Sequence, residues 1–322
     1  MQRTLDDLVR REHFDVIHCV TQFFGYFRFP HDVPVVSDSH EVNYDLILRT
    51  SRQTRNLLEK LINYIKYMLG KPEEIRVCKT FDALIATTER DCKVFREVLP
   101  AQSLFVINNG VDPSFLEPQT IQPEPRTMVF TGKMDFYPNR HGIAFFLDKI
   151  FPRILEQAPD ARVYVVGAYP QKDLVRRASD NIIVTGFVND VRPYMSKGGV
   201  YIIPLWIGGG IRGKALEAMA MGKPIVTTSI GCESIRLSHE ESALFADTAD
   251  DFAGAVLRLF GDQNLSHRLA QHAHETVIQY YDWTVQGKAL ERVFETCLAA
   301  KADPGTRTDH SVKVTPSSLM NA

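Results

Sequence analysis

The stretch Tyr201–Cys232 reads YIIPLWIGGGIRGKALEAMAMGKPIVTTSIGC, and its pattern predicts a strand, a glycine turn, a helix and a second strand. The apolar, β-branched run Tyr201–Ile207 is typical of a buried parallel strand. Good helix formers fill Ala215–Met221, and Pro224 marks the end of that helix before a second apolar run, Ile225–Thr228. This order of elements predicts a parallel α/β sheet.

The turn between the first strand and the helix has the chemistry of an anion site. Gly208, Gly209 and Gly210 let backbone N–H groups approach a phosphate, and the start of a helix adds about half a positive charge. Arg212 and Lys214 bring two full charges to the same place. Charge-assisted hydrogen bonds of this kind are worth roughly 1.5–3 kcal/mol each. The turn therefore predicts a site for a ligand that carries phosphate groups.

One alternative for this turn is a dinucleotide site. Gly208, Gly210 and Gly213 form the pattern G-x-G-x-x-G after a strand, and Glu233 follows the next strand, where a ribose-binding acid would lie. That interpretation makes the protein an NAD-dependent oxidoreductase. The fingerprint normally lies on the first strand of its domain, however, and several strands precede this one. Two basic side chains also suit a terminal diphosphate better than a pyrophosphate held by backbone alone.

Length and composition bound the remaining possibilities. The 322 residues suit two domains, and 44% hydrophobic with 24% charged residues is ordinary for a globular protein. A net charge of −2 gives no reason to expect nucleic acid as a partner. Five scattered cysteines, no signal peptide and no apolar run of about 18–20 residues predict a reduced, cytoplasmic chain without a disulfide or a metal site.

In the first third of the chain, the end of one strand is of functional interest. The strand Val33–Val36 is followed by Asp38, His40 and Glu41, and ligands in open α/β sheets lie at the carboxyl ends of strands. The alternative is that Asp38 caps a helix and that His40 is an ordinary surface residue.

The residues Thr54–Leu69 predict an amphipathic helix. Leu57, Leu61, Ile65 and Met68 fall on one stripe. The other face and the flanks are basic, through Arg49, Arg52, Arg55, Lys60, Lys66 and Lys71. Such a helix suits peripheral contact with an anionic membrane, at the inner face of the cell membrane. The alternative is a helix that packs on its own domain with a solvated basic face.

The residues Glu217-Ala218-Met219-Ala220, with Gly222-x-Pro224 after them, resemble the donor site of the retaining GT-B glycosyltransferases known as glycosyl transferases group 1. The turn Asn108–Pro113 and the turn Tyr281-Asp282-Trp283 are also similar to segments of that family. The resemblance implies two doubly wound Rossmann-like domains facing each other across a cleft. It also implies transfer of a sugar from a nucleotide-diphosphate donor to a saccharide or lipid-linked acceptor, with retention of configuration and without a metal. Polysaccharide biosynthesis is a common setting of the family.

The resemblance also assigns roles to individual residues. Glu217 would hold the ribose, the G-F-V turn at Gly186 would pass the nucleotide base, and His40 would face the transferred sugar. The residues expected to act on the sugar and diphosphate are His40, Lys133, Arg212 and Lys214. The residues expected to bind the donor are Gly132, Gly186, Phe187, Val188, Gly209, Gly210, Ile211 and Glu217.

The expected domain organisation follows from the same resemblance. An acceptor-side domain over 1–120 and a donor domain over 127–283 are joined by the linker 121–126. A helix over 284–300 crosses back to the first domain, and the polar tail 301–322 is expected to be disordered. The first domain is expected to lack its initial βα units. A second hypothesis is therefore a truncated, non-catalytic protein that binds nucleotide.

Overall fold

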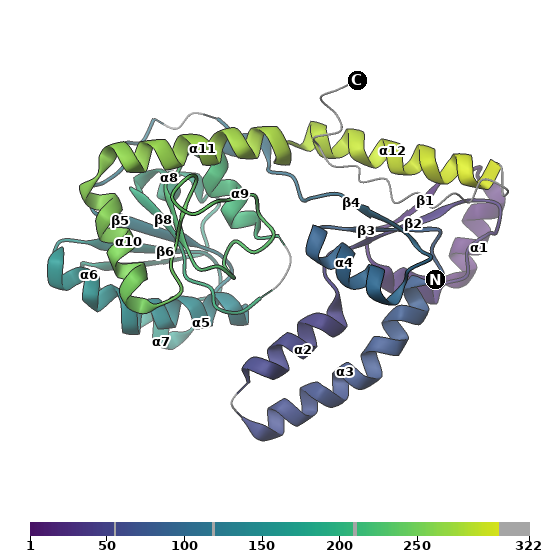
Figure 1. Cartoon of the computed structure of the whole chain (residues 1–322), viewed down its shortest axis with the longest axis horizontal. Helices are drawn as coiled ribbons and strands as arrows, with labels where there is room; N and C mark the ends of the chain where they lie inside the picture. The colour runs from purple at the N-terminus through teal and green to yellow at the C-terminus, as the bar shows by residue number, and fades with distance from the viewer. Residues whose placement is uncertain (55, 118–119, 209–210, 303–322) are drawn as a thin grey trace. The chain divides into compact units, whose positions relative to one another are not determined.

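A computed structural model describes residues 1–54, 56–117, 120–208 and 211–302 of the chain. They form two compact units: residues 1–109 with the chain from Thr284 onward, and residues 110–283 (Figure 1). Each unit contains one fully parallel sheet. This confirms the predicted class of two parallel α/β domains. None of the described helices has both the length and the apolar character needed to cross a bilayer.

The first unit has a four-stranded sheet in the order β1-β2-β3-β4. Its strands are β1 (Ile17–Cys19), β2 (Val35–Ser39), β3 (Ala83–Ala86) and β4 (Ser103–Val106). Its helices are α1 (Gln2–Arg11), α2 (Asn43–Gln53), α3 (Leu57–Cys78), α4 (Glu89–Val98) and α12 (Trp283–Ala302, of which Thr284 onward belongs to this unit), with a 3-10 turn, η1 (Gln22–Tyr26).

Both faces of the first sheet are buried, because successive strand residues point to opposite sides. On one face Val36 and Phe105 pack with Val293 of α12. On the other face Leu84 and Leu104 belong to a second cluster with residues of α4. The C-terminal helix therefore supplies part of the core of the first unit.

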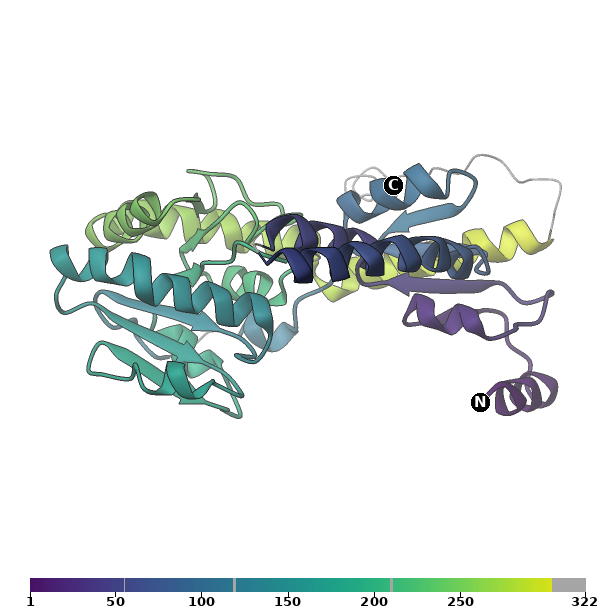
Figure 2. The same ribbon diagram turned by 90° about the horizontal axis from the view of Figure 1, so that it is seen from below.

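The predicted helix over 54–69 is wrong in its bounds. The structure has two helices here, because α2 ends at Gln53 and α3 begins at Leu57 and continues through Pro72 to Cys78. Asn56 causes the new start, because its Oδ1 accepts hydrogen bonds from the N–H groups of Leu58 (3.0 Å) and Glu59 (3.3 Å). Helices α2 and α3 lie side by side and extend away from the sheet (Figure 1; Figure 2).

The second unit has a six-stranded sheet in the order β10-β9-β8-β5-β6-β7. Its strands are β5 (Thr127–Thr131), β6 (Arg162–Val166), β7 (Ile182–Gly186), β8 (Val200–Ile203), β9 (Ile225–Thr227) and β10 (Leu244–Phe245). Its helices are α5 (Tyr137–Phe145), α6 (Phe151–Gln157), α7 (Lys172–Val175), α8 (Arg192–Lys197), α9 (Gly213–Ala220), α10 (Ala249–Gly261) and α11 (Gln263–Tyr281), with the short turns η2 (Pro113–Phe115) and η3 (Phe146–Ile150).

The central stretch folds as the sequence predicts, as strand β8, helix α9 and strand β9. The first strand is shorter than the predicted run Tyr201–Ile207 and ends at Ile203, because the chain leaves the sheet at Pro204. Its four residues are all buried, as are Ile225 and Val226 in β9. This βαβ unit lies in the middle of the second core.

Candidate functional site

The strand order of the second unit determines where a ligand can bind. The chain runs from β5 outward through β6 and β7, and then returns to place β8 on the other side of β5. The order of the strands therefore reverses between β5 and β8. Open α/β sheets bind ligands at such a point, outside the carboxyl ends of the strands. Gly132 and Lys133 follow β5, and Gly208 and Lys214 follow β8, so both predicted segments lie at this edge.

Glycine backbones pack closely at the ends of β5, β6 and β7. A Cβ at Gly167 would lie 1.9 Å from the carbonyl oxygen of Gly132, and both glycines have positive φ angles, of 142° and 150°. The N–H of Gly132 donates to the carbonyl of Val166 (3.0 Å), and that of Gly167 donates to Gly186 (3.1 Å). Because no side chain fits between Gly167 and Gly132, backbone atoms of these two glycines form this part of the site, which we call the glycine floor.

Lys214 lies above this glycine floor. Its Nζ donates a hydrogen bond to Oδ1 of Asn139 (2.7 Å) and lies 4.1 Å from the ring centroid of Phe130. A Cβ at Gly132 would lie 2.8 Å from this Nζ. Burial, together with the nearby charge of Arg212, lowers the pKa of Lys214 to about 7. An anion placed beside Lys214 would stabilise its protonated form.

Arg212 is the residue immediately before α9, with φ −86° and ψ 99°. Its guanidinium packs against Gly208, where a Cβ would lie only 2.1 Å from Nη2. Gly208 has a φ of 137°, so its backbone conformation requires glycine. The first N–H groups of α9 and two basic side chains thus share one end of the helix. This arrangement favours a bound anion.

Glu217 lies three residues after Lys214 and therefore shares its face of α9. It is half-buried, and this burial raises the pKa of its carboxyl group, while the charge of Lys214 lowers it and that of Asp112 raises it. The phenol of Tyr201 is fully buried near Glu217 and shares a hydrogen bond with Thr131. The carboxylate is available as a hydrogen-bond acceptor for hydroxyl groups of a ligand.

Lys133 is less well placed than its position after β5 suggests. Its Nζ lies 3.4 Å from Oδ2 of Asp135, and 5.3 Å from the ring centroid of Tyr169. The side chain is largely exposed. The structure therefore pairs Lys133 with a neighbouring acid.

The remaining predicted donor-binding residues have varied positions. Gly186 ends β7 with a φ of 69°, the next residue Phe187 is exposed, and Val188 is partly buried. Ile211 packs against the core of the unit. Gly209 and Gly210 lie outside the described residues.

His40 belongs to the first unit, where it follows β2. Its carbonyl oxygen accepts a hydrogen bond from Oγ1 of Thr87 (3.1 Å), and its side chain is exposed. The alternative role for Asp38, as a helix cap, is wrong, because this residue lies in β2 and its Oδ2 is 3.3 Å from Nε2 of His18. The other predicted side chains all lie in the second unit.

Sequence reasoning missed Asn139. This residue lies in the first turn of α5 and is buried. Its Nδ2 donates to the carbonyl of Lys133 (2.9 Å), while its Oδ1 accepts from Lys214. Asn139 therefore connects the loop after β5 with the first turn of α9. The only local signal is Pro138, which is typical of a helix start.

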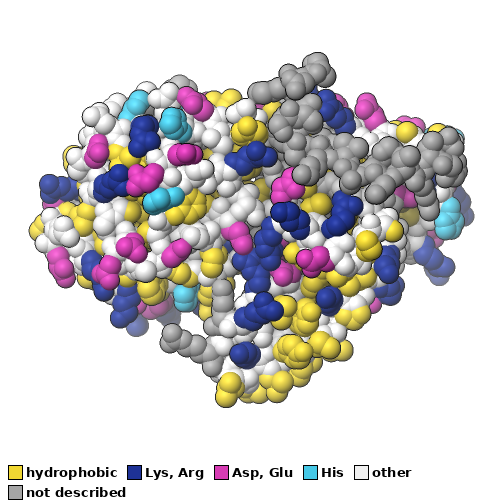
Figure 3. Space-filling model, viewed as in Figure 1, with side chains coloured by type: hydrophobic (Ala, Val, Ile, Leu, Met, Phe, Trp, Pro, Cys, Tyr) yellow, Lys and Arg dark blue, Asp and Glu magenta, His cyan; other side chains and the backbone are white. Residues whose placement is uncertain are grey.

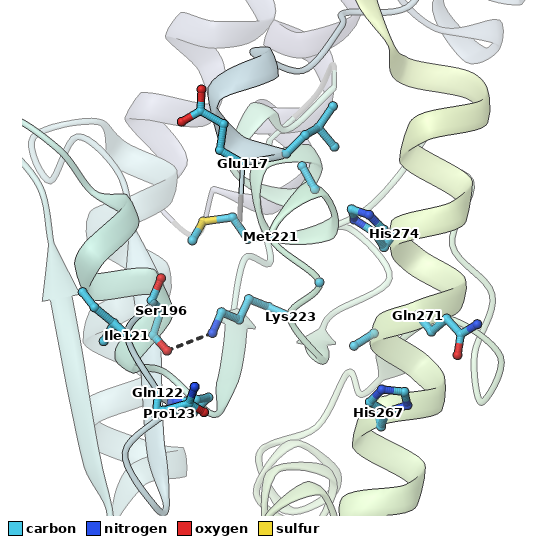
Figure 4. A pocket seen from close by; sticks show the side chains of 14 residues that line it. Glu117, Ile121, Gln122, Pro123, Ser196, Met221, Lys223, His267, Gln271 and His274 are labelled. Atoms are coloured by element: carbon cyan, nitrogen blue, oxygen red, sulfur yellow. Dashed lines mark hydrogen bonds between the residues drawn. The ribbon is translucent and has the colours of Figure 1, made fainter. Parts of the chain in front are cut away.

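A separate pocket of about 540 Å³ lies at the other end of α9, beside Met221 and Lys223 (Figure 4). Lys223 is buried, and its Nζ donates to the carbonyls of Ser196 (2.9 Å) and Gly198 (3.1 Å). Burial lowers the pKa of Lys223 to about 8. The C-terminal end of a helix carries a partial negative charge, so this end of α9 is less suited to phosphate than its start.

Two family matches cover most of the chain. Residues 1–115 match the family described as Glycosyltransferase Family 4, and residues 125–262 match Glycosyl transferases group 1. A phosphatidyl-myo-inositol mannosyltransferase of Mycolicibacterium smegmatis is 30% identical over 60% of this chain and 52% of its own length. An uncharacterized glycosyltransferase of Methanocaldococcus jannaschii is 22% identical over 89% of this chain and 76% of its own. The chain thus spans about half the length of the mycobacterial relative.

Solved structures share the fold at low sequence identity. A sucrose-phosphate synthase from Thermosynechococcus elongatus has a TM-score of 0.68 at 19% identity, covering 93% of this chain and 79% of its own. The Anabaena protein HepE, solved in complex with UDP, has a TM-score of 0.70 at 14% identity, covering 91% of this chain and 82% of its own. These similarities support the fold of both units.

Proposed function

Since this chain belongs to the GT-B glycosyltransferases of the group 1 and family 4 type, we propose that it transfers a sugar from a nucleotide-diphosphate donor to an acceptor, with retention of configuration. The observation that carries the proposal is the grouping of Arg212 and Lys214 at the start of α9, with Glu217 one turn further along the helix, at the switch point of the sheet. The relatives named above are themselves glycosyltransferases, and HepE was solved with UDP.

The proposed donor pose follows from the charges. The diphosphate lies against the N-terminus of α9, between Arg212 and Lys214, and the glycine floor at Gly132 lets it approach the backbone. Glu217 then lies one helical turn further and accepts hydrogen bonds from the ribose hydroxyls. The turn Gly186–Val188 passes the nucleotide base.

In the proposed reaction, the bond between the sugar C1 and the diphosphate oxygen breaks, and a bond from C1 to the oxygen of an acceptor hydroxyl forms on the same face of the sugar. The proton of that hydroxyl passes to the departing diphosphate. Negative charge develops on the departing diphosphate. Arg212, Lys214 and the N–H groups of α9 stabilise that charge, which is the main catalytic requirement of the step. Because these groups supply positive charge, we expect no requirement for a divalent ion.

The test is the release of nucleoside diphosphate from UDP-, GDP- and ADP-sugars, with and without simple saccharide acceptors and with EDTA in parallel. We expect release with one donor class, unaffected by EDTA, and an anomeric signal in the product that matches the donor in its proton NMR spectrum. Glu217→Gln should remove most of the release. Binding of a nucleotide sugar without any turnover would instead favour the non-catalytic hypothesis.

A further inference from the structure

The outward face of α3 is strongly apolar. Eight large side chains between residues 57 and 69 are each 43–81% exposed. They are Leu57, Leu58, Leu61, Ile62, Tyr64, Ile65, Met68 and Leu69. Figure 3 shows hydrophobic side chains gathered over the part of the molecule where α3 lies. Single exposed apolar residues are ordinary, but a contiguous apolar patch marks an interaction surface.

The opposite face of α3, which packs toward α2, is the more polar one. Its half-buried positions are Asn63, Tyr67, Gly70 and Glu74. The Glu74 carboxylate accepts hydrogen bonds from the N–H groups of Asn43 (3.0 Å) and Tyr44 (2.9 Å) at the start of α2. Oγ of Ser51 donates to the carbonyl of Lys60 (3.0 Å) at the other end of the hairpin. Polar contacts thus hold α3 with its apolar side outward, the reverse of an ordinary surface helix.

Basic side chains border the apolar face of α3. At 100° per residue, the eight apolar side chains occupy an arc of roughly 160°. Lys60 lies just beyond one border of this arc and Lys66 just beyond the other, and both side chains are exposed. Arg52 adds an exposed cation at the end of α2, whereas Glu59 is the one acid between 57 and 69. An apolar arc bordered by lysines is typical of a helix that lies in a membrane interface.

We propose that the outward face of α3 docks on an anionic lipid bilayer. The apolar arc enters the boundary between headgroups and acyl chains, and Lys60, Lys66 and Arg52 contact lipid phosphates. Charge complementarity favours lipid over a second copy of this chain. In a symmetric dimer the apolar patch of one copy packs against the same patch of the other. Lys60 and Lys66 of both copies would then border one interface, and only Glu59 of each copy would offset their positive charge. The proposal concerns where the protein works and stands independently of the proposed sugar transfer.

The experiment is co-sedimentation of the full chain with vesicles of phosphatidylcholine alone or mixed with phosphatidylglycerol. We expect binding to the anionic vesicles that weakens with added salt. The triple variant Leu61→Gln, Ile65→Gln and Met68→Gln should lower the partition coefficient roughly tenfold or more. Lys60→Gln with Lys66→Gln should remove the preference for anionic lipid. Ile278→Gln, at an exposed position of α11, is the matched control and should bind as the wild type does.

Thermal unfolding separates binding from folding. Since the three substituted side chains are exposed, the triple variant should unfold at the same midpoint as the wild type. The proposal is overturned if the wild type does not bind anionic vesicles, or if the triple variant binds them as strongly as the wild type. It is also overturned in favour of self-association if sedimentation velocity shows a dimer that the triple variant abolishes.

Discussion

Nζ of Lys214 lies 2.7 Å from Oδ1 of Asn139. Residues 75 positions apart in the chain thus join the first turn of α9 to the first turn of α5, above the glycine floor at the switch point of the sheet. Asn139 also donates to the carbonyl of Lys133 (2.9 Å). This contact orients a lysine whose pKa is lowered to about 7 by burial and by Arg212.

The first prediction concerns the pH dependence of nucleotide binding. Above pH 7 Lys214 is largely neutral in the free protein, and a bound diphosphate favours its charged form. Binding therefore takes up a proton. Affinity for the preferred nucleoside diphosphate should fall by up to about tenfold per pH unit between pH 7.5 and 9. Isothermal titration calorimetry in two buffers of different ionisation enthalpy measures both the affinity and the proton uptake.

The matched variant is Lys214→Arg, which keeps its charge throughout this range. Its affinity should change little with pH, and its proton uptake should disappear. An unchanged slope in Lys214→Arg would show that another group titrates.

Stability without ligand should also depend on Lys214. In the folded state its pKa lies below the ordinary value of 10.5, so between about pH 7 and 10.5 the unfolded chain holds a proton that the folded chain has lost. The contribution of Lys214 to the free energy of unfolding therefore rises with pH across this window. Urea unfolding measures the free energy of unfolding of the wild type and of Lys214→Met. The value for the wild type should increase relative to that of the variant as pH rises. A constant difference would contradict the lowered pKa.

The pKa shift of Glu217 has the opposite effect on how stability depends on pH. Burial raises its pKa in the folded state, so stability is lost as pH rises from about 4.5 through the folded-state pKa. Glu217→Gln lacks this loss and should gain stability relative to the wild type as pH rises above 4.5. The same variant should bind nucleotide more weakly by about 1.5–3 kcal/mol, if the carboxylate accepts ribose hydroxyls. A variant that binds as tightly as the wild type would remove Glu217 from the ribose site.

Lys133 and Arg212 should differ in importance. Lys133 is exposed and paired with Asp135, whereas Arg212 packs on Gly208 beside the start of α9. We expect Lys133→Gln to weaken nucleotide binding less than about threefold, in line with an exposed charge. Arg212→Gln should weaken it by about tenfold or more, as for a charge-assisted hydrogen bond. Calorimetric titration compares the two, and equal losses would contradict this distinction.

The glycine floor can be tested by adding one methyl group. Gly167→Ala places a Cβ against the carbonyl of Gly132 and forces a positive φ, so it should cost about 2–4 kcal/mol of stability. Gly254→Ala is the control, because a Cβ there meets nothing within 4 Å in the helix α10. It should stabilise the protein by about 1 kcal/mol. Unfolding midpoints in urea give both values, and a tolerated Gly167→Ala would argue against close backbone packing.

The sequence predicts well those elements whose ends are marked by nearby glycine and proline residues. Helix α9 follows a glycine run and ends before Gly222 and Pro224, so its bounds of Gly213–Ala220 lie within two residues of the prediction. Periodicity was a poorer guide at α3. It finds the apolar stripe but cannot tell whether that stripe faces a core or solvent, and it cannot anticipate that Asn56 starts a new helix.

Contacts between residues far apart in the sequence account for the remaining differences between the predicted and the observed candidate site. The hydrogen bond from Lys214 to Asn139 depends on the order of β5 and β8 in the sheet, which no local pattern contains. Lys133 has the expected charge and position in the sequence, but its exposed side chain pairs with Asp135, two residues away. Charge and spacing therefore predicted which segments lie at this edge of the sheet, but not the contacts that their side chains make there.

The central claim is that a nucleotide-diphosphate donor binds at the start of α9 with its ribose on Glu217. The most direct measurement is a calorimetric titration of the wild type and Glu217→Gln with UDP, GDP, ADP and NAD. We predict binding of one nucleoside diphosphate, clearly weakened in Glu217→Gln, and no comparable binding of NAD. Binding of NAD alone, or diphosphate binding that Glu217→Gln leaves unchanged, would contradict the account.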